Sequence, residues 1–183
     1  PSAVKVFNYL ATLWRGNIRF TPAMLFAIGF VSTFITGGLT GLILGDSALD
    51  INVHDTYFVT GHFHIVMGVS AIYGMMAGVY HWFPKMYGRM MNKKLGYFHF
   101  WVTFISAYGV FFPMHFLGLA GMPRRIPDFP DSYSAWNSIA TFGSFITMVS
   151  TIFFGYVIFV TFTANVRVGY NPWRSVTNFE FNK

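Results

Sequence analysis

The stretch Thr56–Pro84, TYFVTGHFHIVMGVSAIYGMMAGVYHWFP, contains no Asp, Glu, Lys or Arg. Three other stretches share this property: Phe20–Gly45, Leu95–Pro123 and Ser132–Val166. The charge-free runs are 26 to 35 residues long, and a transmembrane helix needs about 20 mostly apolar residues. Each run can therefore cross a bilayer. We predict an all-α fold, a polytopic bundle of transmembrane helices with four full spans.

The composition agrees with a membrane protein. The chain has 183 residues, of which 54% are hydrophobic, 21% aromatic and 10% charged, whereas about 25% of a soluble domain is charged. A surface with so few charges excludes a soluble globular protein. The absence of cysteine excludes a disulfide framework and Cys-ligated zinc or iron–sulfur centres. The net charge is +6, but the basic residues are too sparse for a nucleic-acid-binding patch, so we expect no nucleic-acid partner.

The first residues indicate the end of a fifth helix. Pro1–Trp14 is apolar apart from Lys5 and is too short for a complete span. The chain has no initiator Met and opens inside this apolar segment. We therefore expect residues 1–183 to form a single membrane domain that is one piece of a longer protein.

The charged residues between the runs indicate how the chain is oriented. With four spans, the connections alternate between two sides of the membrane, which we call side A and side B. Side A carries nine basic residues and one acid, and side B carries five acids and two arginines. The positive-inside rule then places side A in the cytoplasm or matrix. Side A comprises Arg15, Arg19, Lys85, Arg89, Lys93, Lys94, Arg167, Arg174, Lys183 and Glu180, and side B comprises Asp46, Asp50, Asp55, Asp128, Asp131, Arg124 and Arg125.

Proline and glycine predict local features of the helices. Pro22 suits the first turn of a helix, whereas Pro84 and Gly88 are expected to break one. Gly37-Gly38 and the pair Gly74/Gly78 are expected at close contacts between helices, because small residues let membrane helices approach one another.

Two histidines inside the second run give the strongest chemical signal. His62 and His64 are two residues apart, and two residues of a regular α-helix turn through about 200°. The two imidazoles therefore point in nearly opposite directions and cannot chelate one metal. They could each ligate a different centre, and axial ligation of two haems suits that geometry. The alternative is that each is a polar core residue hydrogen-bonded to a neighbouring helix, although ionisable residues inside a membrane tend to be functional.

Side B carries other residues suited to binding charged groups. His54 and Asp55 are adjacent and can offer nitrogen and oxygen ligands to a divalent cation, although a solvated loop pair or a helix cap is the alternative. Arg124 and Arg125 suit carboxylates as bidentate donors, haem propionates among them. Their alternative is a loop that fixes topology or binds lipid headgroups. Asp50 is a candidate neighbour in the same cluster.

Lys5 stands apart from both sides. It is ten residues before Arg15, which is roughly 15 Å of helix and about half the hydrocarbon thickness. A buried ammonium there suits a proton relay, and Ser2 lies on the same helical face. The alternative is a surface segment. The remaining histidines have no comparable partners and are expected to be structural: His81, His99 and His115.

Taken together, these motifs resemble a known family. His54–Tyr57, His62–His64, Pro113–Gly118 and Gly121–Arg125 are similar to subunit I of cytochrome c oxidase, the catalytic subunit of the haem–copper oxygen reductases. The resemblance extends from Pro1 to about residue 164. It implies that the chain is the C-terminal portion of that subunit: the end of helix eight, helices nine to twelve and an inner-side tail. The family's copper-ligating histidines would then precede this chain.

The resemblance implies a role for the residues in the motifs. His62 would be the proximal ligand of the high-spin haem, His64 an axial ligand of the low-spin haem, and Phe63 would lie between them. His54 and Asp55 would ligate magnesium or manganese.

The resemblance also implies roles for the remaining candidates. Arg124 and Arg125 would hold haem propionates, with Asp50 nearby. Lys5 and Ser2 would belong to a proton path.

The activity implied by the resemblance is that of a terminal oxidase. Electrons would pass from the low-spin haem to the high-spin haem and its copper, where oxygen is reduced to water, coupled to proton translocation. The cofactors would be two haems of the haem A type, copper held outside this chain, and Mg²⁺ or Mn²⁺. The partners would be the rest of subunit I, subunits II and III, cytochrome c or an equivalent donor, and the lipid bilayer.

The membrane would be the mitochondrial inner membrane or, alternatively, the bacterial cytoplasmic membrane. The chain would be active only within the complex. From the residues alone, two other functions stay open: an electron-transfer cytochrome that does not reduce oxygen, and a proton-path transporter.

Overall fold

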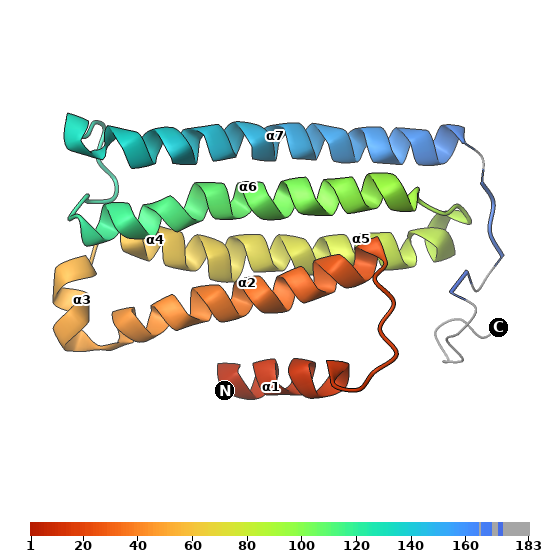
Figure 1. Cartoon of the computed structure of the whole chain (residues 1–183), viewed down its shortest axis with the longest axis horizontal. Coiled ribbons are helices and arrows are strands. Elements are labelled where there is room, and N and C mark those ends of the chain that lie inside the picture. The colour runs from red at the N-terminus through yellow and green to blue at the C-terminus, as the bar shows by residue number, and fades with distance from the viewer. Residues whose placement is uncertain (165, 170–171, 174–183) are drawn as a thin grey trace.

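The structure is a computed structural model that describes residues 1–164, 166–169 and 172–173, and all regular elements in that part of the chain are helical. Its long helices lie side by side in a bundle, with α1 at the edge against α2 (Figure 1). In chain order the elements are α1 (Ser2–Leu13), α2 (Pro22–Gly45), α3 (Ser47–Val53), α4 (Tyr57–Phe63), the π-helix η1 (His64–Val69), α5 (Ser70–Tyr87), α6 (Lys93–Leu119), the 3₁₀ turn η2 (Asp131–Tyr133) and α7 (Ser134–Thr163).

Four helical segments are long and apolar enough to cross a membrane, which confirms the predicted spans: Pro22–Gly45, Tyr57–Tyr87, Lys93–Leu119 and Asp131–Thr163. The second span consists of α4, η1 and α5 in continuous succession. The short α3 and the connection between α6 and α7 lie at one end of the bundle, which is side B, and the connections α1–α2 and α5–α6 lie at the other (Figure 1). The side A residues Arg174, Glu180 and Lys183 lie outside the described residues.

Side chains just before three of the spans cap the first turns of their helices. Thr21 accepts a hydrogen bond from the backbone N–H of Met24 at 3.2 Å, and Pro22 occupies the first turn of α2 as predicted. Thr56 caps α4, and Asn92 caps α6 through the N–H groups of its first turn. Such caps satisfy backbone donors that have no partner inside the helix.

The expectation that Pro84 breaks a helix is wrong. Helix α5 continues through Pro84 to Tyr87 and ends at Gly88, which has φ 65°. Pro84 lies in the last turn, so the backbone hydrogen bond that a proline cannot donate is lost close to the end of the helix. Gly88 adopts the left-handed conformation that glycine tolerates, and its N–H donates to the carbonyl of Pro84 at 2.8 Å.

Close helix contacts occur at only some of the expected glycines. A Cβ added to Gly37 would lie 2.6 Å from Val66 Cγ2, so α2 and η1 touch there, whereas one added to Gly38 meets nothing within 4 Å. At Gly74 the nearest atom belongs to the Phe30 side chain at 3.9 Å, and at Gly78 to Trp82 of the same helix at 2.9 Å. The pair Gly74/Gly78 therefore does not form the helix contact that its spacing predicted.

Aromatic rings fill the centre of the bundle. Phe26 of α2 is fully buried and lies against Tyr73 and Tyr80 of α5 and Phe100 of α6, with ring centroids 5.1 to 5.7 Å apart. Edge-to-face and offset rings at such distances attract one another beyond their simple burial. This core holds α2, α5 and α6 together, and so fixes the positions of the histidines on the second span.

Candidate functional site

His62, in α4, faces α2. Its Nδ1 lies 2.8 Å from the carbonyl oxygen of Gly37 and 2.9 Å from Thr40 Oγ1. Thr40 donates its own hydroxyl hydrogen to the same Gly37 carbonyl at 2.7 Å. A carbonyl oxygen can only accept, so Nδ1 carries the hydrogen and Nε2 keeps its lone pair. A Cβ on Gly41 would lie 2.9 Å from His62 Cε1, so this glycine leaves room for the ring.

His64, the first residue of η1, faces α6. Its Nδ1 lies 2.8 Å from the carbonyl oxygen of Thr60, one helical turn earlier. The same reasoning places the hydrogen on Nδ1 and the lone pair on Nε2. The ring stacks on Phe111 of α6, with centroids 5.0 Å apart and planes within 12°. Phe63 also contacts it, at 4.5 Å between centroids.

A cavity of about 340 Å³ opens beside His64 between α5, α6 and α7. Its walls are mostly apolar, with hydroxyl groups from α6 and α7 at intervals, among them Thr103 and Ser150, whose side chains bond each other at 2.6 Å. The shape and lining are those of a site for a large apolar group with a few polar substituents.

The angle between the two histidines was predicted for a regular α-helix, but the helix that carries them is not regular throughout. It becomes a π-helix from His64 to Val69. The hydroxyl of Ser70 donates to the carbonyl of Ile65, five residues earlier, at 2.9 Å, and it also lies 3.1 Å from Thr33 Oγ1 of α2. These contacts occupy polar groups in the widened turn. Single π turns inside α-helices are often found at functional sites.

The structure therefore supplies two imidazoles that fit axial ligation of two separate centres. In each, a backbone carbonyl fixes Nδ1 as the donor, which is the arrangement that prepares Nε2 to bind a metal. Both rings are partly exposed, and within the described residues neither Nε2 has a hydrogen-bond partner.

The other histidines pack as side chains of the protein interior. His99 is buried, with Nδ1 3.0 Å from the hydroxyl of Tyr80. His115 is 6% exposed and bonds the carbonyl of Phe111 through Nδ1. Its Nε2 has no partner in the described chain, but the ring lies against Phe58 at 4.9 Å and lines none of the cavities described here. His81 stacks on Trp173 at 5.4 Å near side A.

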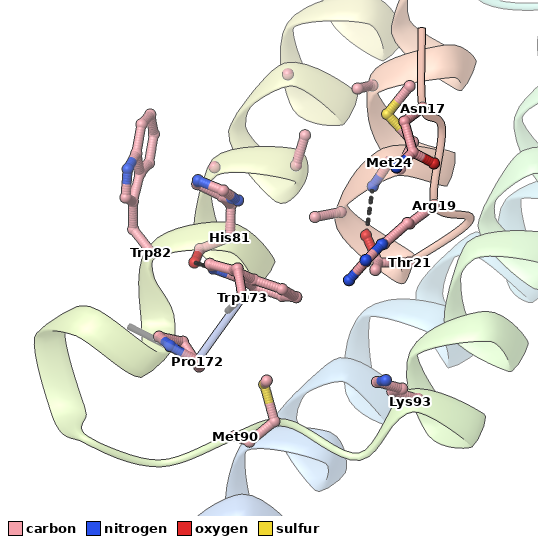
Figure 2. Close-up of a pocket in the computed structure, with 15 residues that line it drawn as sticks. Asn17, Arg19, Thr21, Met24, His81, Trp82, Met90, Lys93, Pro172 and Trp173 are labelled. Carbon is pink, nitrogen blue, oxygen red and sulfur yellow. Dashed lines mark hydrogen bonds between the residues drawn. The ribbon is translucent and has the colours of Figure 1, made fainter. Parts of the chain in front are cut away.

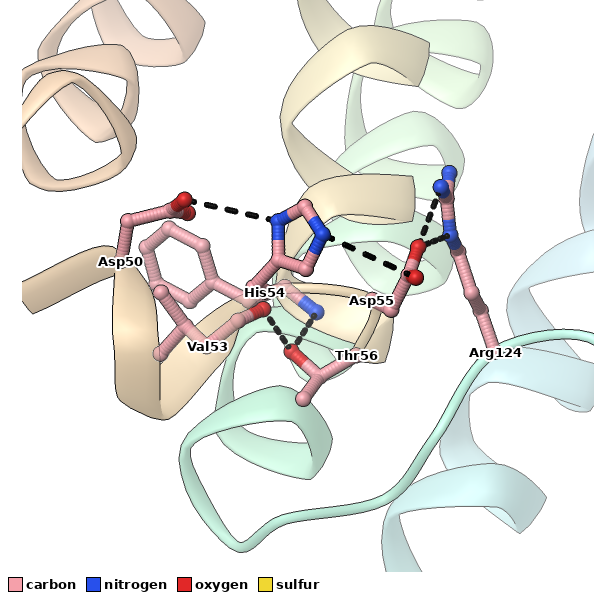
Figure 3. Close-up of polar contacts among 7 residues, drawn as sticks. Asp50, Val53, His54, Asp55, Thr56 and Arg124 are labelled. Carbon is pink, nitrogen blue, oxygen red and sulfur yellow. Dashed lines mark hydrogen bonds and ion pairs between the residues drawn. The ribbon is translucent and has the colours of Figure 1, made fainter. Parts of the chain in front are cut away.

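On side B, residues assigned by sequence to two separate sites come together (Figure 3). The Nη2 of Arg124 lies 2.5 Å from Asp55 Oδ1, and its Nε donates to the same oxygen at 2.7 Å. Asp55 Oδ2 lies 3.7 Å from His54 Nε2, and His54 Nδ1 lies 3.4 Å from Asp50 Oδ2. Asp50, His54, Asp55 and Arg124 thus form one chain of ionisable side chains, which we call the side B cluster.

Backbone contacts build this cluster. The N–H of Arg124 donates to the carbonyl of Asp55, and the N–H of Tyr57 donates to the carbonyl of Met122, each at 3.0 Å. The loop after α6 is thereby held against the start of α4. The hydrogen bond and positive charge of Arg124 lower the pKa of Asp55 below its ordinary value. Arg125 forms none of these contacts and is exposed, with φ 62°, although its positive charge also contributes to the lowered pKa of Asp55.

A complete metal site is absent from the described residues. No three His, Cys, Asp or Glu side chains among them form a group that could hold a metal ion. His54 and Asp55 therefore provide at most two donors from the side B cluster, and Asp55 already shares one oxygen with Arg124.

Lys5 and Ser2 lie on the same face of α1, as the sequence predicted. Both line a cavity of about 390 Å³ between α1 and α2, together with Tyr9 and Phe30. The rings of Tyr9 and Phe30 meet edge to face at 5.5 Å and join the two helices.

Some contributors to the site had no signal that singled them out in the sequence. Thr40 and the carbonyl of Gly37 orient His62, and Phe111 supports His64, yet each resembles many other residues of the spans. The charge-free runs locate the helices but do not indicate which hydroxyl or ring will meet a histidine.

Comparison with known proteins gives one consistent family. Residues 1–152 match the family described as cytochrome c and quinol oxidase polypeptide I. An alternative cytochrome c oxidase subunit 1 of Bradyrhizobium diazoefficiens is 48% identical, over 97% of this chain and 31% of that protein. The cytochrome c oxidase subunit 1 of Yarrowia lipolytica is 47% identical, over 92% of this chain and 32% of that protein.

The fold is also found among solved structures. A heme-copper terminal oxidase dimer is similar with a TM-score of 0.69 and 21% identity, over 80% of this chain and 28% of that one. The chain thus spans about a third of the length of the curated relatives it matches.

Proposed function

The chain belongs to the cytochrome c and quinol oxidase polypeptide I family, and from this membership we propose that it forms part of the catalytic subunit of a cytochrome c oxidase. In this proposal His62 binds the high-spin haem and His64 the low-spin haem. The observation that carries it is the pair of Nε2 atoms with free lone pairs on opposite faces of one helix, each fixed by a carbonyl at 2.8 Å from Nδ1.

The side chains around each histidine fit this assignment. A haem bound at His64 would find the apolar cavity between α5, α6 and α7 beside it. A haem bound at His62 would meet α2, where Gly41 leaves room beside the ring. When bound, the two haems and a copper ion would supply the electron transfer and the reduction of oxygen to water. The protein's contribution is to hold the two imidazoles on a single helix, with Phe63 between them in the chain.

The side B cluster, together with Arg125, would bind the haem propionates and a divalent cation. Arg124 and Arg125 present guanidinium groups suited to carboxylates, and Asp50 lies within the same cluster through His54. His54 and Asp55 would supply two ligands of Mg²⁺ or Mn²⁺, with the remaining donors outside the described chain. The ion pair of Arg124 with Asp55 joins a residue proposed for the propionates to one proposed for the cation.

Protons would enter along α1. Lys5 and Ser2 share the cavity between α1 and α2, and an ammonium with a neighbouring hydroxyl can pass a proton through ordered water. We propose that these two residues form part of a proton path from side A.

The proposal requires partners that complete the enzyme. The family's copper ligands would lie in the remaining N-terminal part of the subunit, and subunits II and III with cytochrome c or an equivalent donor would complete electron delivery. The haems are of the haem A type in this proposal. The membrane is the mitochondrial inner membrane or the bacterial cytoplasmic membrane.

Separate removal of the two histidines tests the proposal. In the assembled oxidase, His62→Ala should abolish the carbon monoxide difference spectrum of the high-spin haem and leave the low-spin haem band in place. His64→Ala should remove the low-spin band. His115→Ala is the matched control, since it removes a buried histidine of another helix that lines neither the cavity beside His64 nor the other cavities, and it should leave both ligand sets intact. If the carbon monoxide spectrum survives unchanged in His62→Ala, the assignment of that ligand is wrong.

A metal analysis of the same complex separates this function from that of a simple electron-transfer cytochrome. The oxidase proposal requires copper in the complex. Haem without copper would favour the cytochrome, and the absence of haem in a pyridine haemochrome assay would favour a transporter.

A further inference from the structure

A large cavity lies at the side A end of the bundle, and neither His62 nor His64 lines it; Figure 2 shows the residues that do. Its volume is about 680 Å³, and it is formed by the connection before α2, the side A half of α5, the start of α6 and residues 172–173. None of the residues proposed above to bind haem, metal or protons lines it. We call it the side A cavity.

The side A cavity is lined by positive charge on one side. Arg19 precedes α2 and Lys93 begins α6, and both side chains line the cavity from the same side in Figure 2. Both residues are exposed. Within the part of the chain that the structure describes, neither forms an ion pair with a carboxylate. Two cations at one cavity that have no carboxylate partner among the described residues favour an anionic ligand.

Small residues line the deeper part of the cavity. Ala27 of α2 and Gly74 and Ala77 of α5 form this wall. Ala27 is six residues into the membrane from Thr21, which corresponds to about 9 Å of helix. The missing helix contact at Gly74 explains the space: nothing approaches its Cβ position closer than Phe30 at 3.9 Å. An apolar wall that continues inward from a cationic rim matches a lipid, whose headgroup is charged and whose chains are apolar.

Aromatic residues line the opposite side of the cavity. Trp173 stacks on His81 with planes within 6°, and its indole N–H donates to the His81 carbonyl at 3.3 Å. Trp82 lies beside them in Figure 2. Tryptophan rings concentrate at the level of lipid headgroups, where an apolar ring and a polar N–H are both satisfied. The cavity therefore has its rim at the membrane interface.

We propose that the side A cavity binds one anionic phospholipid. Its phosphate lies between Arg19 and Lys93, and an acyl chain runs along the wall formed by Ala27, Gly74 and Ala77. Side A is the leaflet where the positive-inside rule places the basic residues of the chain, and an anionic headgroup there is attracted to lysine and arginine. The proposal goes beyond oxygen reduction and does not depend on the haem assignments.

Lipid retention by the complete oxidase tests this proposal. The purified complex would be stripped of lipid, incubated with equal amounts of phosphatidylglycerol and phosphatidylcholine, washed in detergent, and examined by native mass spectrometry. The wild type should retain phosphatidylglycerol preferentially. The double variant Arg19→Gln/Lys93→Gln should lose that preference, by about fivefold for each charge removed. Arg15→Gln/Lys94→Gln is the matched control, because it removes the same charge from side A at residues that do not line the cavity.

A third variant tests the apolar wall. Gly74→Leu keeps both cations and places a side chain in the cavity, where its Cβ would meet only Phe30 at 3.9 Å, so it should reduce retention of both lipids while the haem spectra stay unchanged. If Arg19→Gln/Lys93→Gln and its control lost the preference for phosphatidylglycerol equally, that preference would come from the overall positive charge of side A, and the proposal would be overturned. Unchanged preference in Arg19→Gln/Lys93→Gln, or a protein segment filling the cavity in the structure of the assembled complex, would also overturn it.

Discussion

The two faces of the second span differ in how they hold their histidine. On the α2 face, His62 is fixed by polar atoms, with Gly37 and Thr40 both within 2.9 Å of Nδ1. On the α6 face, His64 bonds only its own helix and stacks on Phe111, and both residues line a cavity of about 340 Å³. One imidazole is therefore oriented by a neighbouring helix and the other mainly by its own helix and by ring stacking. Substitutions that affect one face should leave the other intact, and this gives four predictions.

The largest effect on assembly of the oxidase is expected from a substitution where α6 meets the second span. A Cβ on Gly118 would lie 2.1 Å from the backbone nitrogen of Phe58, so Gly118→Ala must push the two helices apart. Overpacking costs about 1–3 kcal/mol where side chains can yield, and a backbone atom yields less. We expect Gly118→Ala to prevent the assembled oxidase from accumulating in the membrane, measured by immunoblot and haem content. Gly38→Ala, which meets nothing within 4 Å, should accumulate normally, and normal levels of Gly118→Ala would contradict the tight contact.

A smaller loss of stability is expected from a substitution at Gly37, on the α2 face. Its Cβ would lie 2.6 Å from Val66 Cγ2 and 3.1 Å from the Val66 nitrogen. Gly37→Ala should lower the thermal stability of the complex by the equivalent of about 1–3 kcal/mol. The displaced carbonyl should also alter the high-spin haem while the low-spin band is retained. A change confined to the low-spin haem would reverse the proposed assignment of the two faces.

The sequence predicted the spans well because membrane crossing imposes a simple rule on long segments. The four charge-free runs coincide with the four long apolar helical segments to within a few residues, and Pro22 lies in the first turn of α2 as predicted. The faces of His62 and His64 followed from helical periodicity even though the helix changes to a π-helix at His64. Their roles as haem ligands rest on the family and stay a prediction.

Features that depend on contacts between distant residues could not be predicted. The ion pair of Asp55 with Arg124 joins positions 69 residues apart, and the sequence offers no reason to pair them rather than assign them to a metal and a propionate. The same is true of Gly118, whose contact with Phe58 exists only once α6 has packed. At Gly74 the spacing favoured a helix contact, but the neighbouring helix approaches only through Phe30, and a cavity results.

A third prediction concerns the stacking partner of His64. Phe111→Leu keeps an apolar side chain but removes the ring that lies parallel to the imidazole at 5.0 Å. Loss of an aromatic pair costs about 0.5–1.5 kcal/mol, so the complex should assemble with a less firmly held ligand. We expect a shift in the absorption maximum and midpoint potential of the low-spin haem, with the carbon monoxide spectrum unchanged. Phe112→Leu is the control, since Phe112 belongs to the same helix and does not stack on His64.

The smallest effect is expected from Thr40, and it is the most specific test of the α2 face. Thr40→Val keeps the shape of the side chain but removes the hydroxyl 2.9 Å from His62 Nδ1. The Gly37 carbonyl remains as acceptor, so the tautomer with hydrogen on Nδ1 should persist, and the loss should be about 1 kcal/mol, the net value of one hydrogen bond. The iron–histidine stretching frequency of the high-spin haem, measured by resonance Raman spectroscopy, should shift slightly because the hydrogen bond at Nδ1 sets the basicity of Nε2.

Thr36→Val is the control for this prediction. It removes a hydroxyl from the same helix, but that hydroxyl bonds Tyr108 rather than a histidine, so the frequency should stay unchanged. If both variants gave the same shift, helix packing rather than the hydrogen bond would control the ligand, and the contrast between the two faces would disappear.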